Sequence, residues 1–420
     1  MIYRLVFFEL RKNFIRRYLL IATFVLFSIN VYFIYNQYVS GLDNTGYFMP
    51  HTRQTQVRWD FYKTMHKKLD GKLTTAKARY VVEENKRVAS IISDDTYSKD
   101  YQANTHTGYF WSDYVMVNKY FYVPMKYLST YTVNNEEIVK QAQANIMFYD
   151  KYGNPYEKAK NQFIAVNYKN RSIGLFYDTK PWEVLFDYNF SDLIILLLII
   201  LGLVPVFTSE KEANMQGLIL STRQGKKYVN AAKVLSSMVY VIFLVSIFSV
   251  LNLLLFKLLY GLNGAELPVY AIEKYQHTPL GYSLGTFYFV TQLLKTTGLI
   301  SFGMFILLLS SLCKRVVYPY LISAITMVGS LYAAGFNGSV ETGKAVLSFI
   351  SPFTLLKGNE LYEKLLGIDI LQKFILRAHI CLVVQGLSAC VLCLIICLGL
   401  VRRSAYISGI KFILRQGVAK

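Results

Sequence analysis

Residues 193–207 read LIILLLIILGLVPVF, a run without a single charged side chain. Such a run crosses the hydrocarbon core of a bilayer as a helix when a few flanking residues contribute. The whole chain has the same character, because 54% of its 420 residues are hydrophobic and only 17% are charged. Its mean hydropathy of +0.31 is too high for an ordinary soluble protein. The sequence therefore predicts a membrane protein.

Five more apolar runs flank this one. Residues 18–35 follow Arg16 and Arg17 and continue into Asn36 without a small-residue cleavage site, so an uncleaved anchor is favoured over a signal peptide. We predict an all-α polytopic protein with six transmembrane helices and a helix-rich external domain between the first and second. The predicted organisation is an elbow helix at 1–17; transmembrane helices at 18–36, 188–208, 234–256, 291–312, 318–336 and 378–401; the external domain at 37–187; a cytoplasmic loop at 209–233; external loops at 257–290 and 337–377; and a tail at 402–420.

The short loops carry the charges that set the orientation. Segment 208–233, the link at Lys314 and Arg315, and the tail after Arg402 are rich in Lys and Arg. Positive charge in short loops marks the cytoplasmic side, so both termini are expected in the cytoplasm of a bacterial cell, with the chain in the plasma membrane. The formal net charge of +19 has the same origin. A nucleic-acid binder would instead gather its basic residues on one solvated face, without long uncharged runs.

The predicted external domain is long enough to fold as one compact unit. All five cysteines of the chain lie outside it, so it has no disulfide framework. Its many tyrosines are attributed to ordinary packing rather than to a peptide- or lipid-binding surface. From helical spacing, breaker residues and the expected cap at Asn134-Asn135, helices are predicted at 54–70, at 75–92, and from Glu136 to the Gly153-Asn154-Pro155 turn.

Three charged residues border or interrupt the apolar runs. A cation at mid-bilayer costs about 3 kcal/mol on insertion scales, so Lys295 is placed near the outer interface as a snorkelling lysine. The alternative is that Lys295 lines a transport path. Asp187 and Asp192 are interpreted as interfacial residues that bound the second span, and they are too few to indicate a membrane-bound transferase.

The sequence contains no convincing catalytic or metal-binding pattern. Gly281-Tyr282-Ser283-Leu284-Gly285 matches a nucleophile elbow, but no strands surround it, so it is interpreted as the turn that begins a helix. Cys390, Cys393 and Cys397 share a face of the last span, where apolar packing is favoured over a metal site. The phosphate-binding pattern G-x-x-x-x-G-K-[ST] is absent. We expect no enzymatic activity, no metal and no cofactor in this chain.

The loop after the second span is the most informative segment. Ser209 and Glu212 have the spacing of a capping box, which predicts a short helix that begins where the span leaves the membrane. A turn at Gln224-Gly225 then leads to a basic helix that enters the third span. The simpler interpretation is a basic connector, which any polytopic protein requires.

In this loop the sequence resembles the permease subunits of ATP-binding-cassette exporters of the type-two class. Their coupling helix has an acidic pair, a glycine, a leucine-rich L-S-T element and a basic approach to the third span. Matching residues, in order, are Glu210, Glu212, Gly217, Leu218, Leu220, Ser221, Thr222, Arg223 and Lys233. The basic element from Tyr3 to Arg17 and the Ser351-Pro352-Phe353 turn add to the likeness.

The resemblance implies a permease that pairs with a second, identical or related permease and with cytoplasmic ATPase subunits, which bind the ATP and Mg²⁺. The substrate would be amphipathic, such as a peptide, lipid or antibiotic. The alternative is a sensor or mechanical transmitter that carries nothing. The residues expected to couple to the ATPase are Ser209, Glu210, Glu212, Gln216, Gly217, Leu218, Leu220, Arg223, Lys226 and Lys227.

Overall fold

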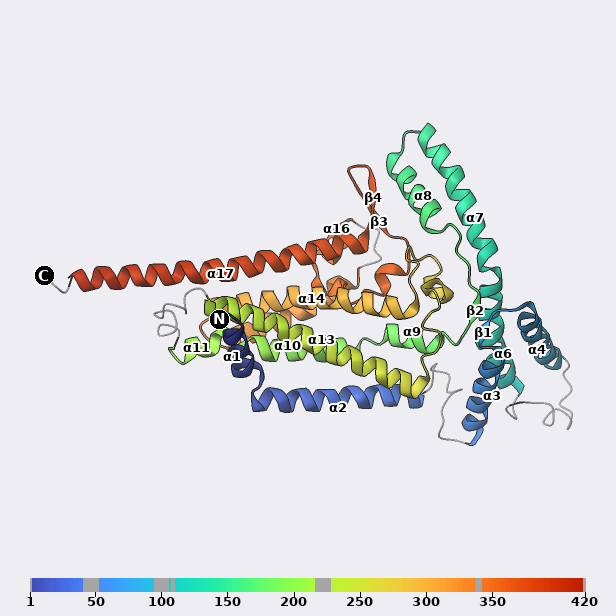
Figure 1. Cartoon of the computed structure of the whole chain (residues 1–420), viewed down its shortest axis with the longest axis horizontal. Helices are drawn as coiled ribbons and strands as arrows, with labels where there is room; N and C mark the ends of the chain where they lie inside the picture. The colour runs from blue at the N-terminus through green and yellow to red at the C-terminus, as the bar shows by residue number, and fades with distance from the viewer. Residues whose placement is uncertain are drawn as a thin grey trace.

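The computed structural model describes residues 2–40, 53–93, 106, 110–215, 228–336 and 342–417. The chain is mostly helical, and Figure 1 shows long helices lying side by side, with a group of helices across one end. Six helical segments are long and apolar enough to cross a membrane, which confirms the predicted number. They are Arg17–Ser40, Lys180–Glu212, Asn230–Tyr260, Leu284–Leu312, Val317–Ala334 and Arg377–Leu398.

The second of these segments forms the centre of the bundle. It consists of α9 (Lys180–Asp187), α10 (Phe190–Leu203) and α11 (Pro205–Glu212). Of its apolar stretch, 78% is buried, compared with 17% for the first and fifth segments. The uncharged run that predicted a membrane span is therefore covered by protein, while the first and fifth segments leave most of their apolar surface uncovered. Around it lie α2 (Arg17–Ser40), α13 (Asn230–Tyr260), α14 (Leu284–Leu312), α15 (Val317–Ala334) and α17 (Arg377–Gly417).

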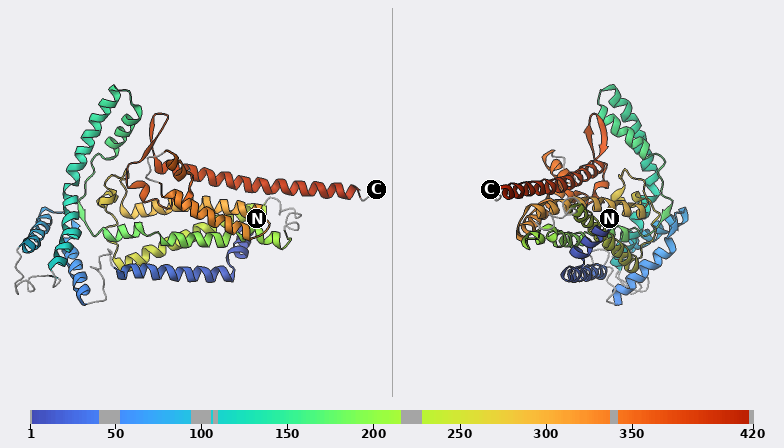
Figure 2. Two further views of the ribbon diagram at one scale, coloured as in Figure 1. Left: turned by 180° about the vertical axis from the view of Figure 1, so that it is seen from behind. Right: turned by 60° about the vertical axis from the view of Figure 1, so that its left-hand side comes forward.

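The group of helices across the end of the bundle, here called the inserted domain, comprises the described residues between α2 and α9. The N- and C-termini lie toward the other end (Figure 1 and the left view of Figure 2). Its elements are α3 (Arg53–Leu69), β1 (Gly71–Lys72), α4 (Thr75–Ser93), α6 (Phe110–Val117), the π-helix η1 (Asn118–Tyr122), α7 (Val123–Lys151), α8 (Pro155–Asn167) and β2 (Leu175–Phe176), which pairs antiparallel with β1. The predicted helices at 54–70 and 75–92 are confirmed.

The prediction of a helix capped by Asn134 and Asn135 was wrong, because both residues lie inside α7. Asn135 is buried, and its amide donates to the Tyr168 carbonyl at 2.7 Å. A tertiary hydrogen bond, which local sequence does not reveal, thus accounts for this asparagine. The predicted end of the helix is confirmed, since Asn154 caps the following α8 by accepting from the Glu157 N–H at 3.1 Å.

The inserted domain is hydrogen-bonded to the loop between α13 and α14, which connects it to the bundle. Buried Arg171 donates to the carbonyls of Thr278 and Pro279 at 2.8 and 3.1 Å. The Tyr168 hydroxyl donates to the His277 carbonyl at 2.6 Å. The loop, which contains the 3₁₀ turns η3 (Val269–Ala271) and η4 (Glu273–Tyr275), therefore holds the domain against the helices.

A second loop contains structure that the sequence analysis did not predict. After α16 (Thr342–Ile350) and the 3₁₀ turns η5 (Pro352–Thr354) and η6 (Glu360–Tyr362), β3 (Gly367–Ile370) and β4 (Lys373–Leu376) form an antiparallel hairpin. Its Phe374 ring lies 5.4 Å from that of Phe163 in α8. The prediction of an all-α chain therefore holds for the large elements but missed two small sheets.

Helix α14 and η5 meet at Gly298, where a methyl group would lie 2.3 Å from the Pro352 carbonyl oxygen. We expect Gly298→Ala to destabilise the protein by about 1–3 kcal/mol, because the backbone must shift to relieve this clash. Thermal unfolding in detergent measures the effect. The control is Gly329→Ala in α15, where no heavy atom lies within 4 Å. A Gly298 variant as stable as the control would show that the contact is not tightly packed.

Glu84 in α4 forms a small ionic cluster with Arg87 at 2.7 Å and His106 at 3.0 Å. Hydrogen bonds from His106 and Arg87 lower the pKa of Glu84 from 4.5 to about 2. A lowered folded-state pKa means that the stabilisation is present above about pH 4.5 and is lost as the pH falls toward 2. We expect a loss of about 1 kcal/mol in unfolding free energy over this range. Glu84→Gln should remove this component, while Glu83→Gln, at an exposed position, should retain it.

Candidate functional site

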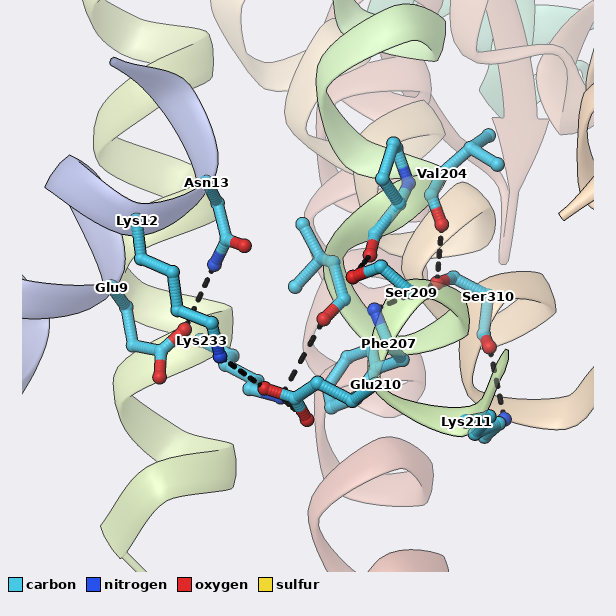
Figure 3. A network of polar contacts seen from close by, with 12 residues as sticks. Glu9, Lys12, Asn13, Val204, Phe207, Ser209, Glu210, Lys211, Lys233 and Ser310 are labelled. Carbon is cyan, nitrogen blue, oxygen red and sulfur yellow. Dashed lines mark hydrogen bonds and ion pairs between the residues drawn. The ribbon is translucent and has the colours of Figure 1, made fainter. Parts of the chain in front are cut away.

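A charged junction (Figure 3) lies at the end of the bundle nearest the N-terminus (Figure 1). Glu210 in α11 is its centre. One carboxylate oxygen lies 2.5 Å from the Lys12 ammonium of α1 (Ile2–Phe14), and the other pairs with Lys233 of α13. The Glu210 and Lys233 side chains are only 8% and 1% exposed. A charge as buried as Lys233 requires a partner, so Glu210 ties together three helices that are distant in sequence.

Helix α1 packs closely against α13 at this junction. Its Asn13 amide donates to the Glu9 carboxylate at 2.8 Å, and both side chains are buried. The Phe14 ring stacks on Tyr240 of α13 with centroids 4.2 Å apart. The segment predicted to form an elbow thus contains a helix that packs on α13.

Two neighbours of Glu210 connect α11 to the next pair of spans. The Lys211 ammonium donates to the carbonyls of Ser310 and Cys313 at 3.0 and 2.9 Å, where it satisfies groups left free at the end of α14. The Glu212 carboxylate accepts the Val316 N–H at 2.8 Å, directly before α15 begins. Through its charged residues α11 therefore contacts α1, α13, α14 and α15.

The predicted capping box is absent. Ser209 lies within α11, and its hydroxyl donates to the Pro205 carbonyl at 2.6 Å. Helix α11 ends at Glu212 instead of beginning near Ser209, because it starts at Pro205, inside the apolar run, and continues past the end of that run. The other predicted coupling residues, Gln216, Gly217, Leu218, Leu220, Arg223, Lys226 and Lys227, lie outside the described residues.

A second charged site lies inside the bundle. Lys295 of α14 lies 2.9 and 3.1 Å from the two carboxylate oxygens of Asp192 in α10. The two side chains are 10% and 9% exposed. The interpretation of Lys295 as a snorkelling lysine was therefore wrong, because its ammonium is paired inside the protein. Pairing replaces the water that each charge would otherwise require.

A polar network surrounds this pair. Asn252 of α13 donates to Ser191 at 2.9 Å and accepts from Asn30 of α2 at 2.9 Å, while Tyr188 donates to Asn30 at 2.8 Å. Beside the pair is a cavity of about 10 Å³, with room for about one water molecule. Four helices thus contribute polar side chains to one buried site.

The other sequence patterns have structural roles. Ser283 caps α14 by accepting the Thr286 N–H at 3.3 Å, which confirms a helix-starting turn rather than a nucleophile elbow. Among the described residues, no group of His, Cys, Asp and Glu is arranged to hold a metal ion.

Sequence reasoning missed Lys12, Lys211 and the Asp192–Lys295 pair. A usable signal for the pair was present: two single charges of opposite sign in separate apolar runs, 103 residues apart. The sequence matches none of the protein families scanned, and a search of curated proteins finds no match either.

Proposed function

We propose that this chain is the permease subunit of an ATP-binding-cassette exporter in a bacterial plasma membrane. One observation carries the proposal: α11, which leads into the loop expected to couple, is joined by ion pairs or hydrogen bonds to four other helices. A force applied to this loop by an ATPase would therefore reach several spans at once. The buried Asp192–Lys295 pair adds support, because ionisable residues inside a membrane bundle commonly mark transport paths.

In this proposal the ATPase subunits bind ATP and Mg²⁺, and a second permease, identical or related, completes the pathway. The substrate class is an amphipathic molecule such as a peptide, lipid or antibiotic. This chain forms the membrane pathway and transmits the motion of the ATPase to the spans, and it carries out no chemical step.

The test is purification of the tagged protein from its native membrane in mild detergent, followed by mass spectrometry and an ATP-hydrolysis assay. We expect a stoichiometric soluble partner that carries G-x-x-x-x-G-K-[ST]. A preparation without ATPase protein or activity would contradict the proposal.

The second candidate is a sensor or mechanical transmitter without substrate flux. It is favoured by the succession of α9, α10 and α11, which leads from the inserted domain to the charged junction, and by the buried Arg171 contacts. One measurement in proteoliposomes that contain the ATPase distinguishes the two candidates. A sensor would hydrolyse ATP without transporting any tested amphipathic compound, whereas an exporter would transport such a compound as it hydrolyses ATP.

A further inference from the structure

A pocket of about 250 Å³ lies where the inserted domain meets α9. Its walls come from α3, η1, α7, the residues before α9, and the loop at Ala271 and Glu273. Figure 1 places α9 between the bundle and the inserted domain. The pocket therefore borders the start of the segment that forms the centre of the bundle.

Carboxylates outnumber ammonium groups in this pocket, although the chain as a whole has a net charge of +19. Lys180 is already paired with Glu183. Glu273 is exposed at the pocket. The charges that line the pocket are Asp178, Glu183 and Glu273 against Lys119 and Lys180. The balance favours a cation over an anion.

Aromatic rings form much of the remaining wall. They are Tyr62, Tyr120, Tyr127, Phe176 and Tyr177. One of these rings already faces a cation, because the Lys119 ammonium lies 5.3 Å from the centre of the Tyr120 ring. Aromatic faces attract ammonium and guanidinium groups and also accept the apolar part of a ligand.

His66, which lines the pocket, has a ring nitrogen without a hydrogen-bond partner. The residue is 8% exposed, and its Nδ1 lies 3.0 Å from the Asp70 carboxylate. Nε2 is buried and makes no hydrogen bond, with Asp178 at 3.8 Å. A buried ring nitrogen without a hydrogen bond leaves a polar position that a hydrogen-bonding group of a ligand can satisfy.

From these features we propose that the pocket binds an organic cation, a guanidinium or ammonium group attached to an apolar body. The positive N-terminus of α9, which could instead attract an anion, is already occupied by Asp178, whose carboxylate accepts the Lys180 N–H at 3.0 Å. This inference goes beyond the proposed function and does not depend on it, because binding is measured without an ATPase.

The experiment measures binding of N-acetyl-arginine amide to the full-length protein in detergent by ligand-observed NMR, with N-acetyl-citrulline amide as the neutral isostere. We expect the arginine compound to bind and the citrulline compound to bind at least about fivefold more weakly, which corresponds to one partly exposed charge contact. Equal binding of the two compounds, or binding of neither, would overturn the proposal.

Two variants place the binding in this pocket. Glu273→Gln changes an exposed side chain and should weaken binding of the arginine compound about fivefold. Asp178→Asn should do the same, since the amide oxygen of asparagine can still accept the Lys180 N–H. The control is Glu266→Gln, an exposed change in the same loop but away from the pocket. If Glu273→Gln and Glu266→Gln bind the compound equally well, the assignment to this pocket is wrong.

Discussion

Replacing Lys295 with methionine is expected to lower the free energy of unfolding by about 3–5 kcal/mol, because Asp192 would remain buried without its counter-ion. The Asp192 side chain is 9% exposed, so water cannot replace the lost ammonium without a rearrangement of α10 and α14. Thermal unfolding in detergent measures the loss. The matched control is Lys257→Met in α13, an exposed lysine in an apolar helix, for which we expect a change of about 0–1 kcal/mol.

The double variant Asp192→Asn, Lys295→Met separates stability from function. Removing both charges eliminates the uncompensated carboxylate, so most of the lost stability should return. If the pair lines a transport path, this stable variant should lose flux in proteoliposomes while its partner still hydrolyses ATP. Full flux would mean that the pair only holds the helices together. Equal destabilisation by Lys295→Met and Lys257→Met would show that Asp192 finds another partner or water.

The sequence was sufficient to locate the six candidate spans because the information is local. An uncharged run of bilayer length predicts a span wherever it occurs, and all six candidate spans lie where such runs were found. The breaker pair Asp70-Gly71 likewise separated α3 from α4, with Gly71 at a φ of 98°. Hydrophobic pattern and backbone preference therefore determined most of the fold.

The parts that could not be predicted depend on contacts between distant residues. Asn135 resembles a helix cap in sequence but instead binds the Tyr168 carbonyl. Lys295 resembles a snorkelling residue until Asp192 is known to lie beside it. In each case a polar residue has both a local and a tertiary explanation, and only the position of its partner decides between them.

In the candidate site, too, the role of a polar residue depends on partners that are distant in sequence. Glu210 was expected to face an ATPase, but its carboxylate is directed into the protein between Lys12 and Lys233 (Figure 3). The acidic pair at Glu210 and Glu212 therefore joins α11 to other helices of its own chain. A coupling role for this region, as proposed above, would depend on the rigidity of this junction.

Glu210→Gln is accordingly expected to be among the most damaging single changes in the chain, with a loss of about 3–5 kcal/mol, because the Lys233 side chain is 1% exposed and would lose its counter-ion. Lys12→Ala is the matched control. Because the Lys12 side chain is 33% exposed, this variant should lose only about 0–1 kcal/mol of unfolding free energy. Thermal unfolding of both variants in detergent provides the comparison. Similar losses for the two variants would contradict the assignment of Lys233 as the dependent charge.

The double variant Glu210→Gln, Lys233→Met then tests whether the junction transmits force. This variant lacks both charges of the buried Glu210–Lys233 pair, so its stability should approach that of the wild type. If the junction is a lever, the double variant should still bind the ATPase partner but should no longer link ATP hydrolysis to movement of the spans, as measured by flux or by distances between spin labels on α13 and α15. Unchanged coupling in a stable double variant would limit Glu210 to a packing role and would place any lever elsewhere in the bundle.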